Sequence, residues 1–533
     1  MAGSRIYPWN AVTRSGYPGF LHIFFLFLFV ILVAAPLVPL LVDTVQYVAT
    51  DPGSVTMVVL PTARVAVLFA NSVALAFAVS GAATGAGVMA GTWLWGHSRG
   101  PGRYIPWILL IFIPIPATLY YFTWSSLFPL TGWIAAWAIQ VMMYLPLLTV
   151  FSYIGLRLVD REKIESGKVA ADDVRVYRHI ILPLAAPLIL AGSGLVFIFS
   201  LLDYTLPSLC SVNVYALEIF ARFSASNRAA EAFLLSLPLI AVAGAAIFFS
   251  QHHIKKAFQN VSWERTRPAP LMSWPGWLSR LTAAAAGVTI LGTGFVLVFL
   301  AVSAFTGQTV PWGKAIYGDL LFSFATALLA AILCLAPAMA VAREMSGFTR
   351  GSGFWWGISM IPLAIPAALA GIGFTIIAGN PLLEPYSQGL LLPVLVSIFR
   401  FIPIAAIVLC AQLCITDRSL IEAGQVYSTG IIDEWRKIRL PLFFPGICMA
   451  GYLVFAFSLG ELGGTLMVVP PGISTITIRL YNYLHYGASG SVAQLSLLLA
   501  GLVILSGVVF LLVLYILRRP ITRKRSNKEK GDT

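Results

Sequence analysis

The sequence predicts an all-α integral membrane protein, with twelve transmembrane helices that form two parallel six-helix repeats. Three observations predict this class: the composition, twelve long apolar stretches, and short matches at a nearly constant offset. Of the 533 residues, 59% are hydrophobic and 10% are charged. Soluble domains contain about 45–50% apolar and about 25% charged residues, so a water-exposed globule is excluded. Long unbroken apolar stretches also exclude a transmembrane barrel, whose strands are short and alternate.

Twelve stretches approach or exceed the roughly 20 apolar residues that a membrane helix needs. The first is too long for the core of a signal peptide and eleven others follow it, so we expect no cleavage. The stretches lie near residues 19–42, 64–90, 104–124, 132–156, 184–206, 230–251, 281–306, 318–342, 354–378, 387–415, 442–468 and 493–517.

The basic residues predict the orientation of these helices. If the amino terminus is cytoplasmic, the cytoplasmic segments carry 28 of the 34 Lys and Arg residues, and the opposite loops carry 4. Lys and Arg resist translocation, so this asymmetry predicts that both termini are cytoplasmic. It also explains the net charge of +13 without nucleic-acid binding.

Short matches between distant segments indicate an internal repeat. Phe-Ser-Leu-Leu-Asp at 199–203 resembles Phe-Ser-Leu-Gly-Glu at 457–461, 258 positions later. Leu182-Pro183 recurs at the same offset as Leu440-Pro441. Upstream of each pair lies a polar loop, which begins at Ile164 in one copy and 257 positions later in the other.

The repeat divides the chain into a first six-helix domain (1–256), a cytoplasmic linker (257–280), a second six-helix domain (281–517) and a basic cytoplasmic tail (518–533). The linker is rich in proline and charge. An even number of spans in each half gives both halves the same orientation, so we expect them to be related by an axis along the membrane normal. A solute would then pass between the halves.

The two polar loops have an amphipathic pattern. In the second loop, apolar residues at mostly helical spacing alternate with charged ones. One interpretation is a helix that lies in the lipid interface; the other is a helix that docks on a protein partner. The apolar residues of this pattern are Val426, Ile431, Ile432, Trp435 and Ile438.

The second loop closely follows a known sequence pattern. In this pattern Glu-Ala-Ala is followed, after three residues of any type, by Gly; nine residues later comes Ile, and after one more residue Leu-Pro. This pattern resembles the signature loop of permease subunits in binding-protein-dependent ABC importers. The first loop is one residue shorter, and Ala170 or Ala171 stands where Gly is expected. The matching residues are Glu165, Ser166, Gly167, Lys168, Leu182 and Pro183 in the first loop, and Glu422, Ala423, Gly424, Gln425, Ser428, Ile438, Leu440 and Pro441 in the second.

The resemblance covers nearly the whole chain and is closest to fused permeases of ferric iron and thiamine importers, which have the type I fold. It implies that each loop is a coupling helix for an ATPase subunit. It also implies two copies of that ATPase, an external substrate-binding protein, surrounding lipid and a bacterial inner membrane. ATP and Mg²⁺ would bind the partner ATPase, with no cofactor on this chain. Ferric iron is the first solute implied, and thiamine or another small solute the second.

The motifs of several other functions are not found. No stretch has the phosphate-binding pattern of a glycine, four residues of any type, and then Gly-Lys-Ser or Gly-Lys-Thr. We therefore expect no ATP binding by this chain. The six histidines are scattered, without a Ser-His-Asp or metal-ligand cluster. Cys410 and Cys414 lie one helical turn apart without further ligands nearby, which favours packing over a metal site. The sequence therefore predicts a transport subunit rather than an enzyme.

Three ionisable residues lie within or near the apolar stretches: Asp203, Arg400 and Glu461. Such residues are costly in lipid and usually face a cavity or a partner. Asp203 and Glu461 are matched across the repeat, so they are candidates for the outward mouth of the pathway, or for hydrogen bonds that order the next segment. Arg400 has no basic counterpart in the first half, and could pair with Glu461 or extend to an interface. An ion pair or a cavity-lining role is favoured over recognition of the substrate, because in the family that the sequence resembles the binding protein provides most of the selectivity.

Two other functions remain open from the sequence. One is a gradient-driven transporter of two six-helix halves, with Asp203 and Glu461 as proton carriers. Against it, residues 91–103 lack the Asp-centred basic motif of the major facilitator type. The other is a membrane enzyme or scaffold, for which no catalytic cluster is found in the sequence.

Overall fold

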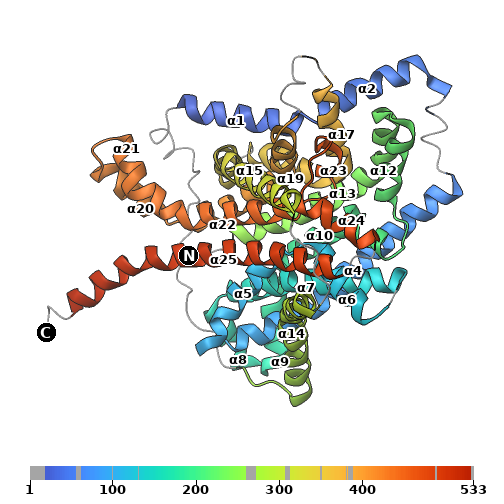
Figure 1. Cartoon of the computed structure of the whole chain (residues 1–533). Helices are drawn as coiled ribbons and strands as arrows, with labels where there is room; N and C mark the ends of the chain where they lie inside the picture. Colours follow the sequence, from blue (N-terminus) through green and yellow to red (C-terminus); the bar gives the residue numbers. More distant parts are fainter. Residues whose placement is uncertain are drawn as a thin grey trace.

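The computed structural model describes residues 19–53, 55, 62–98, 100–129, 131–259, 272–306, 313–347, 351–379, 381, 388–486 and 489–529, and these residues are predominantly helical (Figure 1). Within these ranges, nine helices are long and apolar enough to cross a membrane. The number rises to twelve when each of three bent helix pairs counts as one span. The predicted all-α membrane class with twelve spans is therefore confirmed.

The first half contains the following elements, among which η3 is a 3₁₀ turn and η4 a π-helical turn. They are α1 (Gly19–Ala34), α2 (Leu37–Thr50), α4 (Ala63–Gly96), η3 (Gly100–Tyr104), α5 (Ile105–Phe112), α6 (Ala117–Leu127), α7 (Trp133–Arg157), α8 (Arg161–Ala170), α9 (Asp173–Val176), η4 (Tyr177–Ile181), α10 (Leu182–Leu202), α11 (Thr205–Leu209), α12 (Tyr215–Ser226) and α13 (Ala229–Gln259).

The second half repeats this order, with η5 again a π-helical turn. Its elements are α14 (Gly276–Thr306), α15 (Lys314–Ser346), α16 (Ser352–Ala364), α17 (Ala367–Ala378), α19 (Leu391–Ile415), α20 (Arg418–Tyr427), α21 (Ile431–Glu434), η5 (Trp435–Arg439), α22 (Leu440–Leu459), α23 (Thr465–Val468), α24 (Ile476–Tyr486) and α25 (Ser489–Glu529).

The halves interlock through their first helices. In the first half, α2 packs between α13 of its own half and α17 of the other, while α1 packs on α15 and α16. In the second half, α14 packs between α25 of its own half and α4 of the other. These equivalent arrangements suit two halves related by a two-fold axis. The predicted division at 257–280 stays a prediction, and residues 260–271 of that linker lie outside the described residues.

Three predicted spans are bent rather than straight. The bend is 42° between α1 and α2, 100° between α5 and α6, and 95° between α16 and α17. The last two bends occupy equivalent places and share the sequence Ile-Pro-Ala, at 115–117 and 365–367. In both copies the proline is extended, with ψ of 145° at Pro116 and 141° at Pro366, so the helix ends there and restarts at the alanine. Proline removes a helical hydrogen bond, which explains the break in each of these two spans.

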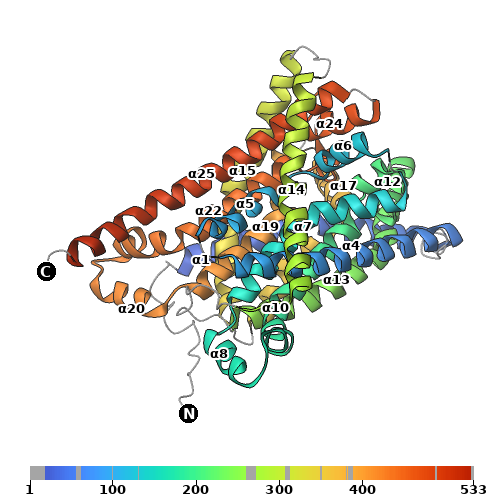
Figure 2. The same cartoon turned by 90° about the horizontal axis from the view of Figure 1, so that it is seen from below.

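Equivalent hydrogen bonds also hold a short helix on each half, at the end opposite α8 and α20. The Ser72 hydroxyl of α4 accepts a hydrogen bond from the Tyr215 amide, at the start of α12, at 2.8 Å. The Ser323 hydroxyl of α15 accepts one from the Ile476 amide, at the start of α24, also at 2.8 Å. Figure 2 shows α8 and α20 toward one side of the molecule, with α12 and α24 toward the other.

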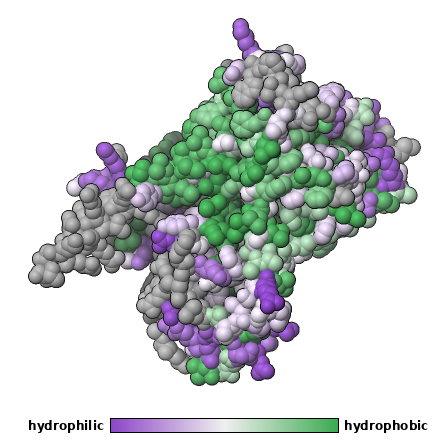
Figure 3. Space-filling view, turned by 60° about the horizontal axis from the view of Figure 1, so that its bottom comes forward, coloured by the Kyte–Doolittle hydropathy of each residue, from purple (hydrophilic) through white to green (hydrophobic). Residues whose placement is uncertain are grey.

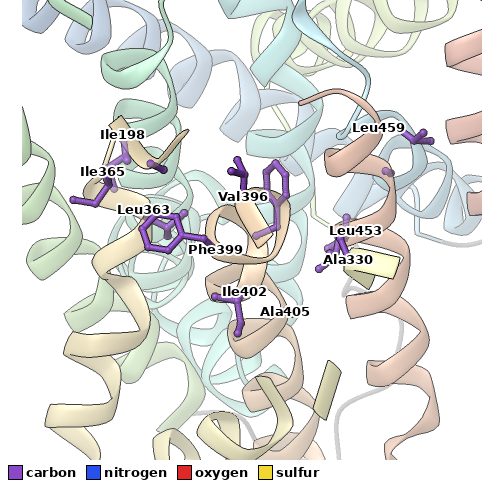
Figure 4. Close-up of a cluster of buried hydrophobic side chains, with 14 of the residues drawn as sticks. Ile198, Ala330, Leu363, Ile365, Val396, Phe399, Ile402, Ala405, Leu453 and Leu459 are labelled. Carbon is purple, nitrogen blue, oxygen red and sulfur yellow. The ribbon is translucent and has the colours of Figure 1, made fainter. Parts of the chain in front are cut away.

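The core extends across both halves, and apolar side chains also cover much of the surface. In Figure 4, Phe399 and Ile402 of α19 lie between Ile365 on one side and Leu453 of α22 on the other. On the surface, Leu291 and Phe248 are each 72% exposed. A broad apolar area occupies the middle of the face in Figure 3, and hydrophilic residues gather toward its ends. This distribution suits a protein whose flanks face lipid.

Candidate functional site

Helices α8 and α20 occupy equivalent positions and begin in the same way. Each follows an aspartate at the N-cap, Asp160 or Asp417, and the Asp417 carboxylate accepts a hydrogen bond from the Ser419 amide at 2.9 Å. A carboxylate at this position satisfies a free amide and is favoured by the helix dipole. Both helices therefore start at a fixed point after a long membrane helix.

The structure explains why the two loops differ by one residue. Between α8 and α9 lie two residues, 171–172, whereas three residues, 428–430, lie between α20 and α21. The missing residue therefore falls in the turn, and the helices before and after it keep their register. Ala171 and Ser428 both cap their helix with extended backbone at negative φ, −152° and −83°. Neither position requires glycine, which accounts for both departures from the signature.

A glycine in each of these helices permits close packing on the segment that follows. A Cβ atom added at Gly424 would lie 2.7 Å from Cδ1 of Ile438, and one added at Gly167 would lie 2.6 Å from Cδ1 of Ile180. Both distances are shorter than carbon–carbon contacts allow. The small residues of the signature therefore bring α8 onto η4 and α20 onto η5, so that each loop forms one compact unit.

Each unit also presents an exposed valine at the equivalent position. Val169 of α8 is 91% exposed and Val426 of α20 is 80% exposed, and the two lie 257 positions apart. The sequence pattern placed Val426 on one apolar face with Ile438, but the structure places them differently, since Ile438 packs inward on Gly424. Ile431 and Ile432 belong to α21, and their side chains lie outside the described residues. Sequence reasoning missed Val169, which the 257-residue offset would have found.

The two units differ in their buried side chains. In the second, the Arg439 Nε donates to the Glu434 carboxylate at 2.7 Å, and these side chains are only 7% and 5% exposed. In the first, the positions 258 residues earlier hold Val176 and Ile181, which are also buried. The same backbone therefore encloses an ion pair in one half and an aliphatic pair in the other. Nearby on the surface, a hydrogen bond from Lys437 lowers the pKa of Asp433.

The linker contacts the first unit. The amide and hydroxyl of Ser273 both donate to the Asp173 carboxylate of α9, the hydroxyl at 2.8 Å. The Trp274 ring packs edge-on against Tyr177 of η4, with ring centroids 5.1 Å apart, and Tyr177 shares a 2.6 Å hydrogen bond with Thr92 of α4. Residues 273 and 274 of the linker are thus packed against the first loop unit.

A cavity of about 200 Å³ lies between the halves, at the ends of α10 and α22 farthest from α8 and α20. Both Ile-Pro-Ala bends contribute to its wall, from 113–118 and 362–367. Tyr144 of α7 and Phe401 of α19 also line it. Asp203, Arg400 and Glu461 all line this cavity as well.

In the second half, the Arg400 Nη1 donates to both oxygens of the Glu461 carboxylate at 2.5 Å. The same carboxylate accepts the Gly464 amide at 2.7 Å. In the first half, Asp203 accepts the Thr205 amide at 2.8 Å and the side-chain amide of Gln140 at 3.2 Å. Each carboxylate therefore orders the segment after its helix, and only Glu461 pairs with a cation within the described chain.

The comparisons with known proteins agree with this arrangement. Residues 102–260, which include the first loop unit, match the family model described as binding-protein-dependent transport system inner membrane component. Within these residues the chain is similar to the transport permeases of this family.

Individual relatives of this chain are named for different transport systems. It is 24% identical to the Fe(3+)-transport system permease protein FbpB 2 of Haemophilus influenzae, over 92% of this chain and 98% of the relative. It is 24% identical to the putrescine transport system permease protein PotI of Escherichia coli, over 41% of this chain and 80% of the relative. It is 28% identical to the putative 2-aminoethylphosphonate transport system permease protein PhnV of Salmonella typhimurium, over 40% of this chain and 78% of the relative.

The remaining predicted loop residues belong to the same units. Glu165 pairs with Arg161 at 2.5 Å, and Lys168 pairs with Asp173 at 3.2 Å. Glu422 is exposed on α20, and the side chain of Gln425 lies outside the described residues. The Leu-Pro pairs begin α10 and α22, directly after the π-helical turns η4 and η5. The Ser166 hydroxyl donates to the Glu162 carbonyl, and Ala423 is exposed.

Proposed function

We propose that this permease forms the translocation pathway of an ATP-driven importer, and that α8 and α20 are the coupling helices for its ATPase subunits. The observation that carries the proposal is the connection of each loop unit to the cavity by one helix. After the loop unit, α10 runs to Asp203 and α22 to the segment that contains Glu461. Each helix has about 20 residues, so it spans about 30 Å. A displacement of a loop unit would therefore move a wall of the cavity.

The physical basis of this coupling is rigidity. Each loop unit is packed through Gly167 or Gly424, so a force on its exposed surface would be transmitted to α10 or α22 rather than absorbed by the loop. Val169 and Val426 would insert into a cleft of the ATPase. ATP binding would bring the two ATPase subunits together and shift the halves from inward-facing to outward-facing states, and hydrolysis would reverse that shift.

The partners and location follow the same proposal. Two copies of the ATPase would bind, one at each loop unit, and they would hold ATP and Mg²⁺, with no cofactor on this chain. A substrate-binding protein would dock on the opposite face, near α12 and α24. The permease would lie in a bacterial inner membrane, surrounded by lipid, with both termini in the cytoplasm. No nucleic acid is involved.

Ferric iron is the first candidate solute, because the relative named for Fe³⁺ transport aligns over 92% of this chain. Thiamine is an alternative from the resemblance of the sequence. Putrescine and 2-aminoethylphosphonate are alternatives from the names of the two shorter relatives. Uptake of each solute by cells with and without the gene would distinguish these candidates.

The coupling role is tested with the exposed valines. The glycines are unsuitable, since a side chain at Gly424 would disrupt the loop itself. We expect Val169→Asp and Val426→Asp to fold normally and to lose most of the co-purifying ATPase. Tyr486→Asp is the matched control, because Tyr486 of α24 is 85% exposed on the opposite face. Retention of the ATPase by both valine variants would refute the assignment of these helices.

A second experiment tests a gradient-driven mechanism. Removal of the ATPase gene should abolish uptake if the permease is ATP-driven. Uptake that persists, and that collapses when the proton gradient is dissipated, would favour Asp203 and Glu461 as proton carriers instead. The structural hydrogen bonds of both carboxylates favour the first outcome.

A further inference from the structure

The central cavity has a volume of about 200 Å³ and is partly open. It therefore has room for a small solute. The wall contains three charged side chains, Asp203, Arg400 and Glu461, with a formal sum of −1.

Arg400 presents unused donors to this cavity. Its two hydrogen bonds both leave Nη1 and end on Glu461, and its side chain is 28% exposed. No other described residue accepts a hydrogen bond from Nε or Nη2. A guanidinium has five N–H donors, so the Nε and Nη2 edge keeps three of them in the geometry that matches an oxyanion.

The guanidinium is also held in place. Glu461 is only 4% exposed in its side chain, and the Gly464 amide fixes one of its oxygens at 2.7 Å. The Phe401 ring lies 5.6 Å from the guanidinium carbon. An arginine that is oriented before binding loses little freedom when it binds a carboxylate or phosphate group.

Asp203 provides the opposite charge from the other half. The Ser200 hydroxyl donates to the Gln140 carbonyl at 2.7 Å, which orients the Gln140 amide group toward Asp203. With the Thr205 and Leu206 amides, this gives Asp203 three hydrogen bonds, and a carboxylate has about four acceptor positions. No basic side chain of the described chain forms an ion pair with it. One position for a cationic group therefore remains.

We propose that this cavity binds a small solute that carries an oxyanion next to a positive centre. The oxyanion binds the Nε and Nη2 edge of Arg400, and the positive centre faces Asp203. This inference rests on the proposed transport function and names the class of solute. The positive centre can be an ammonium group or a metal ion chelated by the oxyanion, and one experiment separates these sources.

The test is calorimetric titration of the purified full-length permease with matched probes. These are β-alanine, propionate and propylamine, together with the 1:1 iron(III)–oxalate complex and oxalate alone. We expect β-alanine to bind at least tenfold tighter than propionate and propylamine if the positive centre is an ammonium group. We expect the iron complex to bind at least tenfold tighter than oxalate if the centre is a metal. Equal affinities for all probes, no binding of any probe, or a preference for propylamine would overturn the proposal.

Variants assign the binding to these side chains. Arg400→Met introduces the residue found at the equivalent position in the first half, Met142. Combining it with Glu461→Gln avoids an unpaired buried carboxylate and keeps an acceptor for the Gly464 amide. We expect this double variant to lose about ten- to a hundredfold in affinity for the preferred probe, the usual range for a hydrogen bond to a charged group. We expect Asp203→Asn to reduce the preference for the positive centre.

Co-purification of the ATPase separates this inference from the proposed function. A folded double variant that keeps the ATPase and binds the probe as tightly as wild type would overturn the inference and leave the transport function intact. Loss of the ATPase from the wild type would contradict the proposed function instead. Elution as a single species in size-exclusion chromatography verifies the fold of each variant.

Discussion

The buried ion pair of the second loop unit provides a quantitative test of how the two halves are built. Glu434 and Arg439 are 5% and 7% exposed, so the energies of surface ion pairs do not apply to them. Removing one partner of a buried pair costs about 3–5 kcal/mol, because the other charge is left without compensation. We therefore expect Arg439→Ile alone and Glu434→Val alone to destabilise the unit by that amount.

The double variant should behave differently, because it copies the first half. Val176 and Ile181 stand at the equivalent positions there and are buried. The first half therefore already accommodates the pair of side chains that Glu434→Val with Arg439→Ile would introduce. The double variant also removes the Arg439 Nη2, which is buried without a hydrogen-bond partner among the described residues and costs about 1–3 kcal/mol. We expect the double variant to equal or exceed the wild type in stability.

Hydrogen–deuterium exchange of residues 431–441 measures this local stability. A loss of 3–5 kcal/mol corresponds to a decrease of roughly a hundred- to several-thousandfold in amide protection for each single variant. The amides of 173–183 in the first loop unit are the internal control and should not change. The reasoning is refuted if either single variant keeps wild-type protection, or if the double variant loses as much as the two single variants combined.

Three further predictions concern other contacts of the same framework. Gly424→Ala should destabilise the second unit by about 1–3 kcal/mol through contact with Ile438, and Ile438→Val should restore its amide protection; without that rescue the packing explanation fails. Ser72→Ala should speed exchange of the Tyr215 amide by about tenfold or more, as expected for a lost hydrogen bond, whereas an unchanged rate would mean that this bond does not hold α12. Asp173→Ala should speed exchange of the linker amides at 273–274 by about tenfold; equal rates in both proteins would show that the linker is held by other contacts.

Much of the fold could be predicted from composition and periodicity, because lipid requires long apolar helices and these are read directly from the sequence. The bends could not be placed by hydropathy, since α5–α6 and α16–α17 are as apolar as straight spans. Their signal was the repeated Ile-Pro-Ala, at 115–117 and 365–367. The two copies are 250 positions apart, so a search confined to the 257–258 offset of the loops would have missed them.

The candidate site was predicted in part. The offset located Gly167 and Gly424, but only the structure shows that these glycines contact Ile180 and Ile438 within the loop. The sequence left open whether Arg400 pairs with Glu461 or lines the cavity, and in the structure it does both. Contacts between residues of different helices depend on how the helices pack, which no local pattern specifies.

Because one chain contains both halves, equivalent positions can hold different side chains. At the cavity, the first half has a carboxylate held by an amide, and the second has a carboxylate paired with a guanidinium. In the loop units, an aliphatic pair stands opposite an ion pair. If two identical chains formed such a pore, a change in one wall would appear in the other, and a guanidinium could not face a lone carboxylate. Fusion removes that constraint, so each half can present a different charge to the same solute. A cavity with one free cationic edge and one free anionic edge is therefore accessible to a fused permease and closed to a symmetric dimer.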